Sequence, residues 1–176
     1  MSVRTVTIDR FESFLHALES TNTRLDILWR PAGDDPRSIH ERSSIDQWVQ
    51  VAIDQYVQVA LALAANTSML SLSLRNLPAT ACLVLARSIK HNATLQSFSL
   101  DAVDTGIDNQ TGVAMAGAIQ HNATLQSFSF VTNGTRISNR TGVAMAEAIK
   151  HNATLLSFRF SAWITQMDVL DGGITQ

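Results

Sequence analysis

Three nearly identical segments recur at a constant spacing, and they constrain the fold of this chain more than any other feature. They read HNATLQSFSL at 91–100, HNATLQSFSF at 121–130 and HNATLLSFRF at 151–160, so both steps from one copy to the next have the same length. A weaker copy, ANTSMLSLSL, occupies 65–74, a slightly shorter step before the first. One such short unit cannot bury a core by itself, so the pattern predicts units that stack into an array.

Each copy ends in a strand pattern and follows a helix pattern. In Phe98, Ser99 and Leu100 apolar and polar residues alternate, which is typical of a strand with one buried face. The segments TGVAMAGAIQHN at 111–122 and TGVAMAEAIKHN at 141–152 place apolar residues at i and i+4, which indicates helices. We expect strands near Met69–Leu74, Leu95–Leu100, Leu125–Phe130 and Leu155–Phe160, with their leucines and phenylalanines pointing inward.

The helices are expected to begin at threonine and to bury a narrow stripe. Thr111 and Thr141 are predicted N-caps. Small residues should let each helix pack closely on its neighbour; these are Gly112, Ala116, Gly142 and Ala146. The predicted inward residues are Met115, Ile119, Met145 and Ile149, with Cys82, Leu85, Ile89, Tyr56, Val59 and Leu63 in the earlier copies.

This succession of a helix, N-x-[TS]-L and L-x-x-L-x-L, repeated from Asp46 to Phe160, resembles leucine-rich repeats of the ribonuclease-inhibitor-like subclass. The resemblance implies a short right-handed α/β solenoid, an arc with parallel strands on the concave side and helices on the convex side. In that family an asparagine usually stands three positions after the last strand leucine. Those positions hold Leu77, Val103, Asn133 and Trp163 here, so we expect no regular asparagine ladder there and looser loops after the strands.

The chain is expected to be one domain with three parts: an N-terminal helical cap and linker (1–45), the repeats (46–160) and a C-terminal cover (161–176). The cap is expected to hold an amphipathic helix with Phe11, Phe14, Leu15 and Leu18, a degenerate strand at Arg24–Trp29, and a turn-rich linker at Arg30–Arg42. A long helix is expected at Asp46–Ala64. The last segment is too apolar for a free tail and should cover the last strand edge or the end of the core.

Composition excludes several classes of function. Thirteen basic and 15 acidic residues give a net charge of −2, which does not suit a nucleic-acid binder. The N-terminus has no continuous apolar region, and polar residues interrupt the longest apolar stretch, so we expect neither a signal peptide nor a membrane span. The single cysteine, Cys82, excludes an intramolecular disulfide and favours a reducing, cytoplasmic compartment. We interpret it as a small core residue rather than a nucleophile.

Other candidate chemistry has simpler explanations. The recurring His91, His121 and His151 fall on adjacent helices about 8–10 Å apart, too far for a shared zinc ion, so we place them beside the negative end of each helix dipole. Seven N-x-[ST] sequons occur. Four of their asparagines, Asn66, Asn92, Asn122 and Asn152, share the helix-to-strand turn, where asparagine tolerates left-handed backbone. Asp101, Asp104 and Asp108 cluster after a predicted strand, but the loop lacks the acidic residue that an EF-hand has at its twelfth position, so they indicate a polar loop.

The chain carries no nucleotide-binding, hydrolase or metalloprotease motif, so we expect no catalysis, no cofactor and no metal. The remaining candidate is a surface. Strand positions that alternate with the core should face the concave side, and the loops at 101–110 and 131–140 differ most between copies, one acidic and one basic. The predicted partner-binding residues are Arg75, Ser97, Ser99, Asp101, Asp104, Ser127, Ser129, Arg136, Arg140, Arg159 and Trp163.

These features favour a non-enzymatic module that binds a cytoplasmic protein and acts by occlusion or scaffolding. Repeats of the kind that this chain resembles also occur in effectors that bacteria deliver into host cells, and the chain would suit that group by analogy. Two alternatives stay open: a regulatory domain of an enzyme system whose chemistry lies in the partner, and a small α/β enzyme. We expect no nucleic-acid or membrane partner, and a monomer or a weak dimer through an edge strand.

Overall fold

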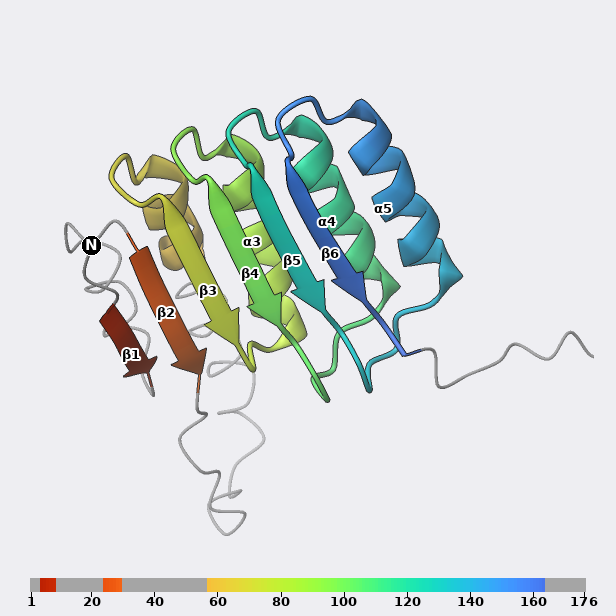
Figure 1. Ribbon diagram of the computed structural model, residues 1–176. Helices are drawn as coiled ribbons and strands as arrows, with labels where there is room; N and C mark the ends of the chain where they lie inside the picture. The colour runs from red at the N-terminus through yellow and green to blue at the C-terminus, as the bar shows by residue number, and fades with distance from the viewer. Residues whose placement is uncertain (1–3, 9–23, 30–56, 164–176) are drawn as a thin grey trace, which may run out of the picture.

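A computed structural model of the chain describes residues 4–8, 24–29 and 57–163. Six parallel strands form one sheet in sequence order, so each strand pairs with the next one along the chain (Figure 1). The strands are β1 (Arg4–Ile8), β2 (Arg24–Trp29), β3 (Ser71–Arg75), β4 (Ser97–Asp101), β5 (Ser127–Val131) and β6 (Ser157–Ser161). The helices are α3 (Ala79–His91), α4 (Asn109–His121) and α5 (Asn139–His151), and residues 57–65 are also helical.

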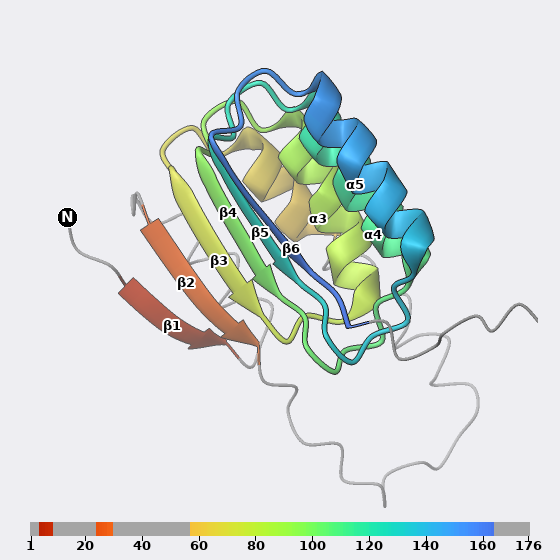
Figure 2. The same ribbon diagram turned by 45° about the vertical axis from the view of Figure 1, so that its right-hand side comes forward.

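The helices α3, α4 and α5 lie side by side on one face of the sheet, and both views show the same order of repeats (Figures 1 and 2). This arrangement confirms the predicted α/β arc. Each repeat strand begins two residues later and ends one residue later than predicted. The apolar residues Leu95 and Leu125 are fully buried, but they belong to the turn before the strand and not to the strand itself.

Of the two strands near the N-terminus, one was predicted and the other was not. Strand β2 matches the predicted Arg24–Trp29, whereas β1 was not predicted and pairs with it in parallel. The structure confirms helix at 57–65, the end of the predicted Asp46–Ala64 helix. The predicted helix around Phe11–Leu18, the linker at Arg30–Arg42, Tyr56 and the cover after Trp163 lie outside the described residues.

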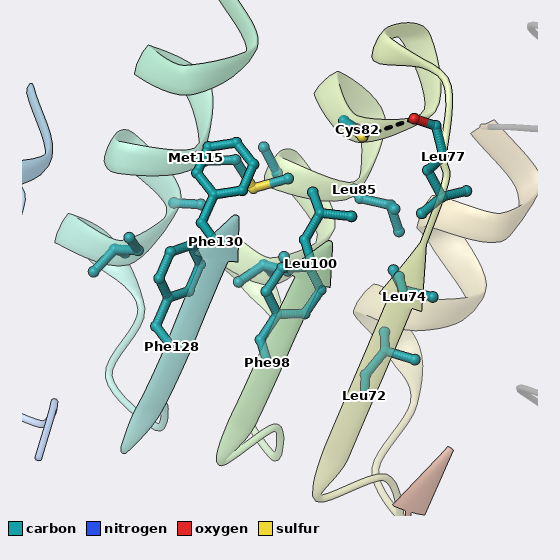
Figure 3. Close-up of a cluster of buried hydrophobic side chains, with 14 of the residues drawn as sticks. Leu72, Leu74, Leu77, Cys82, Leu85, Phe98, Leu100, Met115, Phe128 and Phe130 are labelled. Carbon is teal, nitrogen blue, oxygen red and sulfur yellow. Dashed lines mark hydrogen bonds between the residues drawn. The ribbon is translucent and has the colours of Figure 1, made fainter. Parts of the chain in front are cut away.

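Stacked phenylalanine rings run through the core from repeat to repeat. Phe98, Phe128 and Phe158 are in register on neighbouring strands, with ring centroids 5.8 and 5.9 Å apart. Phe130 and Phe160 form a second stack at 5.9 Å. Figure 3 shows the rings of Phe98, Phe128 and Phe130 on the side of the sheet that faces the helices, with Met115 of α4 beside Phe130. The predicted inward orientation is therefore confirmed for the strand phenylalanines and for Leu72, Leu74 and Leu100, and the helix residues Leu85, Met115, Ile119 and Met145 are buried as predicted. It is wrong for Leu156, which is 83% exposed because it takes the turn position of Gln96 and Gln126 before the strand.

The helices α4 and α5 begin earlier than predicted, at Asn109 and Asn139. The side chain of Asp108 caps α4 by accepting hydrogen bonds from the backbone N–H groups of Gln110 (3.0 Å) and Thr111 (3.3 Å). Ser138 caps α5 in the same position. The prediction that Thr111 and Thr141 are N-caps is thus wrong, because an N-cap needs a side-chain acceptor just before the first free N–H groups, and Asp108 and Ser138 supply it.

Close packing between helices depends on Gly112. A Cβ at this position would clash with the side chains of Thr141 and Ile137 on the next repeat. Ala116 is also buried, as predicted. The equivalent residues of α5 differ: a Cβ at Gly142 would meet nothing within 4 Å, and Ala146 is exposed. Among the described residues, no helix packs against Gly142 or Ala146, so the expected close contact is not seen at α5.

The first step between repeats is shorter than the later ones because the connection between strand and helix is shorter. Only residues 76–78 join β3 to α3, whereas 102–108 and 132–138 join the later strands to their helices. These two longer connections, called the rim loops below, pair with each other: Ala102 N–H donates to Val131 O (2.8 Å) and Asp104 N–H to Asn133 O (3.0 Å). The expected looseness of these loops is therefore not observed.

Asparagines at the helix-to-strand turns bind each repeat to the one before it. The Nδ2 group of Asn122 donates to Ile89 O (2.7 Å) and Asn92 O (2.9 Å), and its Oδ1 accepts from the N–H groups of Thr124 and Leu125 in its own turn. Asn92 and Asn152 repeat the arrangement. One buried amide thus ends a helix, shapes a turn and joins two repeats.

This asparagine ladder (Asn92, Asn122 and Asn152) corrects our interpretation of the recurring asparagines. Their backbone is extended, with φ of −72°, −79° and −86°, and Asn66 is not among the described residues with positive φ. The requirement is therefore for a side chain with both a donor and an acceptor, and not for left-handed backbone. The positions three residues after the strand leucines, by contrast, form no regular ladder, as expected: of Leu77, Val103, Asn133 and Trp163 only Asn133 is an asparagine. Leu77 is buried and Trp163 is exposed, so these positions do not even share one environment.

Replacing the central ring of the first phenylalanine stack should destabilise the whole array. Phe128→Ala removes a fully buried ring between Phe98 and Phe158 and leaves a cavity, so we expect a loss of about 3–5 kcal/mol in the free energy of unfolding. The next residue, Ser129→Ala, is the matched control and should change it by less than about 0.5 kcal/mol. Chemical denaturation measures both. Equal stability of the two variants would contradict the assignment of Phe128 to the core face and Ser129 to the opposite face of β5.

The asparagine ladder predicts unequal effects at two asparagines. Asn122→Ala leaves two backbone carbonyls and two turn N–H groups without their partner, so we expect a loss of about 2–4 kcal/mol. Asn133→Ala removes a single acceptor, 3.2 Å from Ser161 Oγ, and should cost at most about 1 kcal/mol. Thermal or urea unfolding compares them. Similar losses at both sites would mean that the ladder does not hold the repeats together.

Candidate functional site

The sheet face opposite the helices consists largely of serines arranged in rows. In the first row Ser71, Ser97, Ser127 and Ser157 are in register across β3 to β6. The second row holds Ser73, Ser99, Ser129 and Arg159, and the third holds Arg75, Asp101, Val131 and Ser161. We call these twelve residues the serine face. They alternate with the core residues of each strand, and they are half-buried or exposed.

The serine face offers hydrogen-bonding groups on a shallow surface. Within the described part of the chain, the hydroxyl groups of Ser73, Ser99 and Ser129 have no hydrogen-bond partner. A hydroxyl group can both donate and accept, and a small side chain lets a ligand approach the sheet closely. Arg159 replaces the serine of this row on β6, so a positive charge borders the neutral rows.

The rim loops join the serine face at the carboxyl ends of the strands. The third row ends each strand, and Thr132 N–H donates to Ser161 O (2.7 Å), which continues the pairing beyond the sheet. Farther along, Arg136 N–H donates to Ile107 O (3.0 Å), and Arg136 forms an isolated bridge with Asp108. These backbone bonds hold both rim loops in a defined shape beside the third row.

Two residues explain the tight approach of the rim loops. Asp104 has a φ of 56° and Gly134 a φ of 73°. A Cβ at Gly134 would clash with the side chain of Asp104, so glycine is needed there both for its backbone and for the contact. Asp104 is therefore a structural residue of the loop as well as an exposed carboxylate.

The structure brings most of the predicted site residues to one connected surface. Residues on the serine face itself are Arg75, Ser97, Ser99, Asp101, Ser127, Ser129 and Arg159. Asp104 and Arg136 lie in the rim loops, and Arg140 lies in the first turn of α5 at the same edge. Trp163 follows β6 and is 73% exposed. Ser97 and Ser127 lie at the opposite strand ends, about 13 Å from the rim along the strand.

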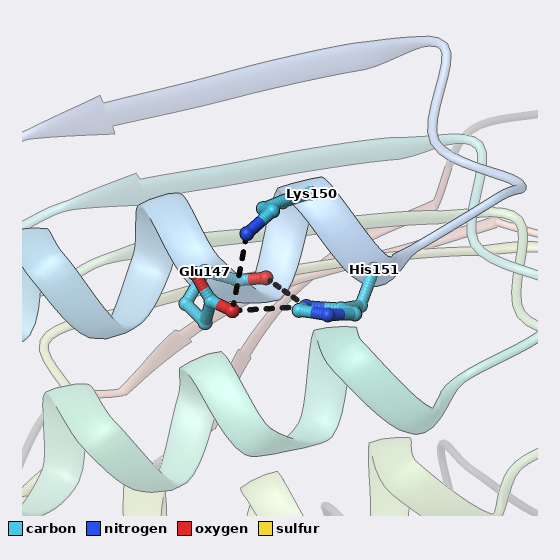
Figure 4. A network of polar contacts seen from close by, with 3 residues as sticks. All are labelled: Glu147, Lys150 and His151. Atoms are coloured by element: carbon cyan, nitrogen blue, oxygen red, sulfur yellow. Dashed lines mark hydrogen bonds and ion pairs between the residues drawn. The ribbon is translucent and has the colours of Figure 1, made fainter.

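Charges on this surface are distributed by repeat. Acidic side chains follow β4 (Asp101, Asp104, Asp108), whereas basic ones follow β5 (Arg136 and Arg140). None of these five charged side chains forms an ion pair with another described residue. Among the described residues, Glu147 pairs with Lys150 (3.7 Å), and its carboxylate lies 3.4 Å from His151 Nδ1, on the exposed side of α5 (Figure 4).

The recurring histidines end their helices, where we predicted them. His121 Nδ1 lies 2.8 Å from Gly117 O and His151 Nδ1 lies 2.9 Å from Glu147 O, so each ring contacts a carbonyl of the last helical turn. Both side chains are exposed. Within the described residues, no three histidine, cysteine or acidic side chains are grouped to hold a metal ion.

Sequence reasoning missed a groove along the amino ends of the strands. It has a volume of about 570 Å³ and crosses three repeats at equivalent positions. Its lining residues are Leu70, Ala93, Thr94, Gln96, Ala123, Thr124, Gln126, Thr154 and Leu156. The signal was present in the repeated HNATL segments, whose alanine and threonine recur in register. Leu156, 83% exposed, stands where the two preceding repeats have Gln96 and Gln126.

The comparisons with known proteins identify the fold. No family model and no curated protein matches this chain. Among solved structures, leiomodin-1 actin-binding site 2 matches with a TM-score of 0.53 and 17% identity, over 89% of this chain and 80% of that one. The likeness supports a leucine-rich-repeat-like α/β fold. No helix in the described residues is long and apolar enough to cross a bilayer.

Cys82 should be unreactive while the chain is folded. The side chain is fully buried, with Sγ 3.9 Å from Leu77 O (Figure 3), and burial raises the pKa of the thiol to about 12. Because the thiolate is the reactive form, an aromatic disulfide reagent at pH 8 should label Cys82 only on unfolding, at a rate that rises with denaturant. Rapid labelling without denaturant would contradict the burial and reopen a nucleophilic role.

Proposed function

We propose that this chain is a non-enzymatic protein-interaction module that binds its partner through the serine face and the rim loops. The observation that carries the proposal is the serine face itself. Its hydroxyl groups point away from a core already filled by leucine and phenylalanine, so their identity is not needed for packing. Such a surface suits a partner that supplies its own hydrogen-bonding groups and fits against small side chains.

The size of the serine face argues that the rim loops take part. A standard protein interface uses roughly 20–30 residues on each side, and strands lie about 4.8 Å apart. Twelve residues on four short strands therefore form only part of such an interface. The rim loops extend it with charged groups of both signs, which can set the orientation of a partner and speed its association.

Trp163 is the best single anchor. Aromatic side chains contribute much of the binding energy in many interfaces, and Trp163 is 73% exposed two residues after the end of β6. Arg159 and Arg140 border the same end of the array. We place the centre of the interface at β5, β6 and the loop between β5 and α5.

The similarity to an actin-binding domain makes actin the first defined probe. It supports a protein partner, and the mechanism would be occlusion or scaffolding. One buried, reduced cysteine is compatible with a partner in the cytoplasm. Membership of the ribonuclease-inhibitor-like subclass and a role as a bacterial effector in a host cell rest on the resemblance of the repeats alone.

Bulky substitutions on the central strands test the proposal. Ser99→Trp and Ser129→Trp place a large side chain on the serine face, whereas Gln120→Trp places the same side chain on the exposed surface of α4. We expect a protein captured by the parent chain, or purified actin, to lose at least about tenfold in affinity to both serine variants and to bind the Gln120 variant normally.

Circular dichroism must show that all three variants keep the melting temperature of the parent within about 2 °C. Full binding by both serine variants would remove the serine face from the interface. Loss of binding in the Gln120 variant alone would move the interface to the helices.

A further inference from the structure

A second groove lies on the helical side of the array, between α3 and α4. It has a volume of about 340 Å³, and the two helices that form it stand side by side in both views (Figures 1 and 2). Its floor is apolar: Ala86 and Ala118 are buried there, and Leu83 and Ala114 are half-buried. None of its lining residues belongs to the serine face or to the rim loops. We call it the helix groove.

Two positive charges border the helix groove and have no acidic partner in the described part of the chain. Arg87 and Lys90 are both exposed and stand three positions apart on α3, where like charges on one helix face repel each other. The sequences of α3 and α4 contain no aspartate or glutamate. The helix dipole favours Lys90 in the last turn, but it does not explain Arg87, which stands before that turn.

The equivalent positions on α5 hold an attractive pair. Two repeats beyond Arg87 and Lys90 stand Glu147 and Lys150, whose charged groups lie 3.7 Å apart. The repeat therefore accommodates an ion pair at these positions, and the repulsion on α3 is not imposed by the fold. A carboxylate from a partner would give Arg87 and Lys90 the interaction that Glu147 gives Lys150.

Gly117 leaves room in the helix groove at a cost to α4, because glycine weakens the interior of a helix. No contact requires glycine here: a Cβ at Gly117 would meet nothing within 4 Å, and its φ is not positive. The equivalent residues on α3 and α5 are Arg87 and Glu147, which both have long side chains. The ring of His121 borders the same space, with Nδ1 2.8 Å from Gly117 O. The missing side chain therefore serves the groove and not the helix.

We propose that the helix groove binds an acidic amphipathic helix of a partner protein. The apolar stripe of that helix packs on the floor between α3 and α4, as in other grooves that receive one face of a helix. Aspartate or glutamate side chains beside the stripe bind Arg87 and Lys90. A guanidinium group donates two parallel hydrogen bonds to one carboxylate, so Arg87 also fixes the orientation of the bound helix.

The chemistry of the helix groove favours a peptide over other anions. A nucleic acid needs phosphate contacts from many basic side chains, and this chain has a net charge of −2. A small inorganic anion would leave the apolar floor uncovered. The site is separate from the serine face, so this inference does not depend on the proposed function. Gln120, the control position for the serine face, does not line the helix groove.

Charge reversal tests the role of Arg87 in the full chain. The probe is a fluorescein-labelled helical peptide with a leucine stripe flanked by glutamates, and its binding is followed by fluorescence anisotropy at physiological salt. We expect Arg87→Glu to weaken the binding at least about tenfold. Lys150→Glu changes the net charge equally on α5 and should weaken it less than about twofold. A peptide with lysines in place of the glutamates should bind Arg87→Glu better than the parent chain.

Two outcomes of this experiment would overturn the proposal. One is equal weakening by Arg87→Glu and Lys150→Glu, which would reduce the effect to net charge. The other is the absence of binding of the glutamate peptide to the parent chain up to about 1 mM.

Filling the helix groove tests its shape separately from its charge. Gly117→Leu should raise the melting temperature by about 1–3 °C, since leucine favours a helix more than glycine does. The same variant should weaken the glutamate peptide at least about fivefold, because the new side chain occupies the groove. Gly142→Leu on α5 also meets nothing within 4 Å and is the matched control, with the peptide affinity of the parent chain. Full peptide binding by Gly117→Leu would refute the proposed mode of binding.

Two further measurements separate this site from the alternatives. Tighter binding of a single-stranded RNA oligonucleotide than of the glutamate peptide would assign the groove to nucleic acid and refute the proposal. Ser129→Trp should leave peptide binding unchanged, so that failure of the serine face and failure of the helix groove can be told apart. Loss of peptide binding in Ser129→Trp would place the peptide on the serine face instead.

Discussion

The fold depends on the hydrogen bonds of one asparagine amide per repeat, buried at Asn92 and Asn122 and half-buried at Asn152. In the asparagine ladder, Nδ2 reaches two carbonyls of the previous repeat while Oδ1 accepts two N–H groups of its own turn. A helix end leaves carbonyls without partners, and a parallel strand needs a fixed start. The asparagine satisfies both at once, which no apolar or hydroxyl side chain of similar size can do. Neighbouring threonines add a further bond, such as Thr124 Oγ1 to Leu95 O at 3.0 Å.

With the turns fixed in this way, the sheet acquires two unlike faces. Alternation along each strand sends phenylalanine and leucine toward the helices and serine toward the other side. The phenylalanine stacks extend the order of the turns through the core, and the paired rim loops extend it past the ends of the strands. The serine face is therefore held in one shape by the bonds and packing on either side of it, and a surface ordered in advance loses less entropy when a partner binds.

Much of this architecture could be predicted from the sequence, because the repeats fix the period, the strands and the orientation of the core. The helix starts could not, since Thr111 and Thr141 resemble caps locally and only the fold shows Asp108 and Ser138 in front of the free N–H groups. The role of the asparagines was missed because their partners lie a whole repeat earlier in the chain. Strand β1 was missed because its unit has no counterpart among the HNATL copies. The site residues were placed by alternation, whereas the groove at the amino ends of the strands emerged only from the stacking of equivalent turns.

The central claim is that a partner binds on the serine face. Site-specific photo-crosslinking tests it most directly, with the crosslinking side chain at Ser129 on β5 in one sample and at Gln120 on α4 in another. The account predicts that Ser129 forms a covalent adduct with a partner protein and that Gln120 does not. An adduct from Gln120 without one from Ser129 would contradict the account and place the interface on the helices.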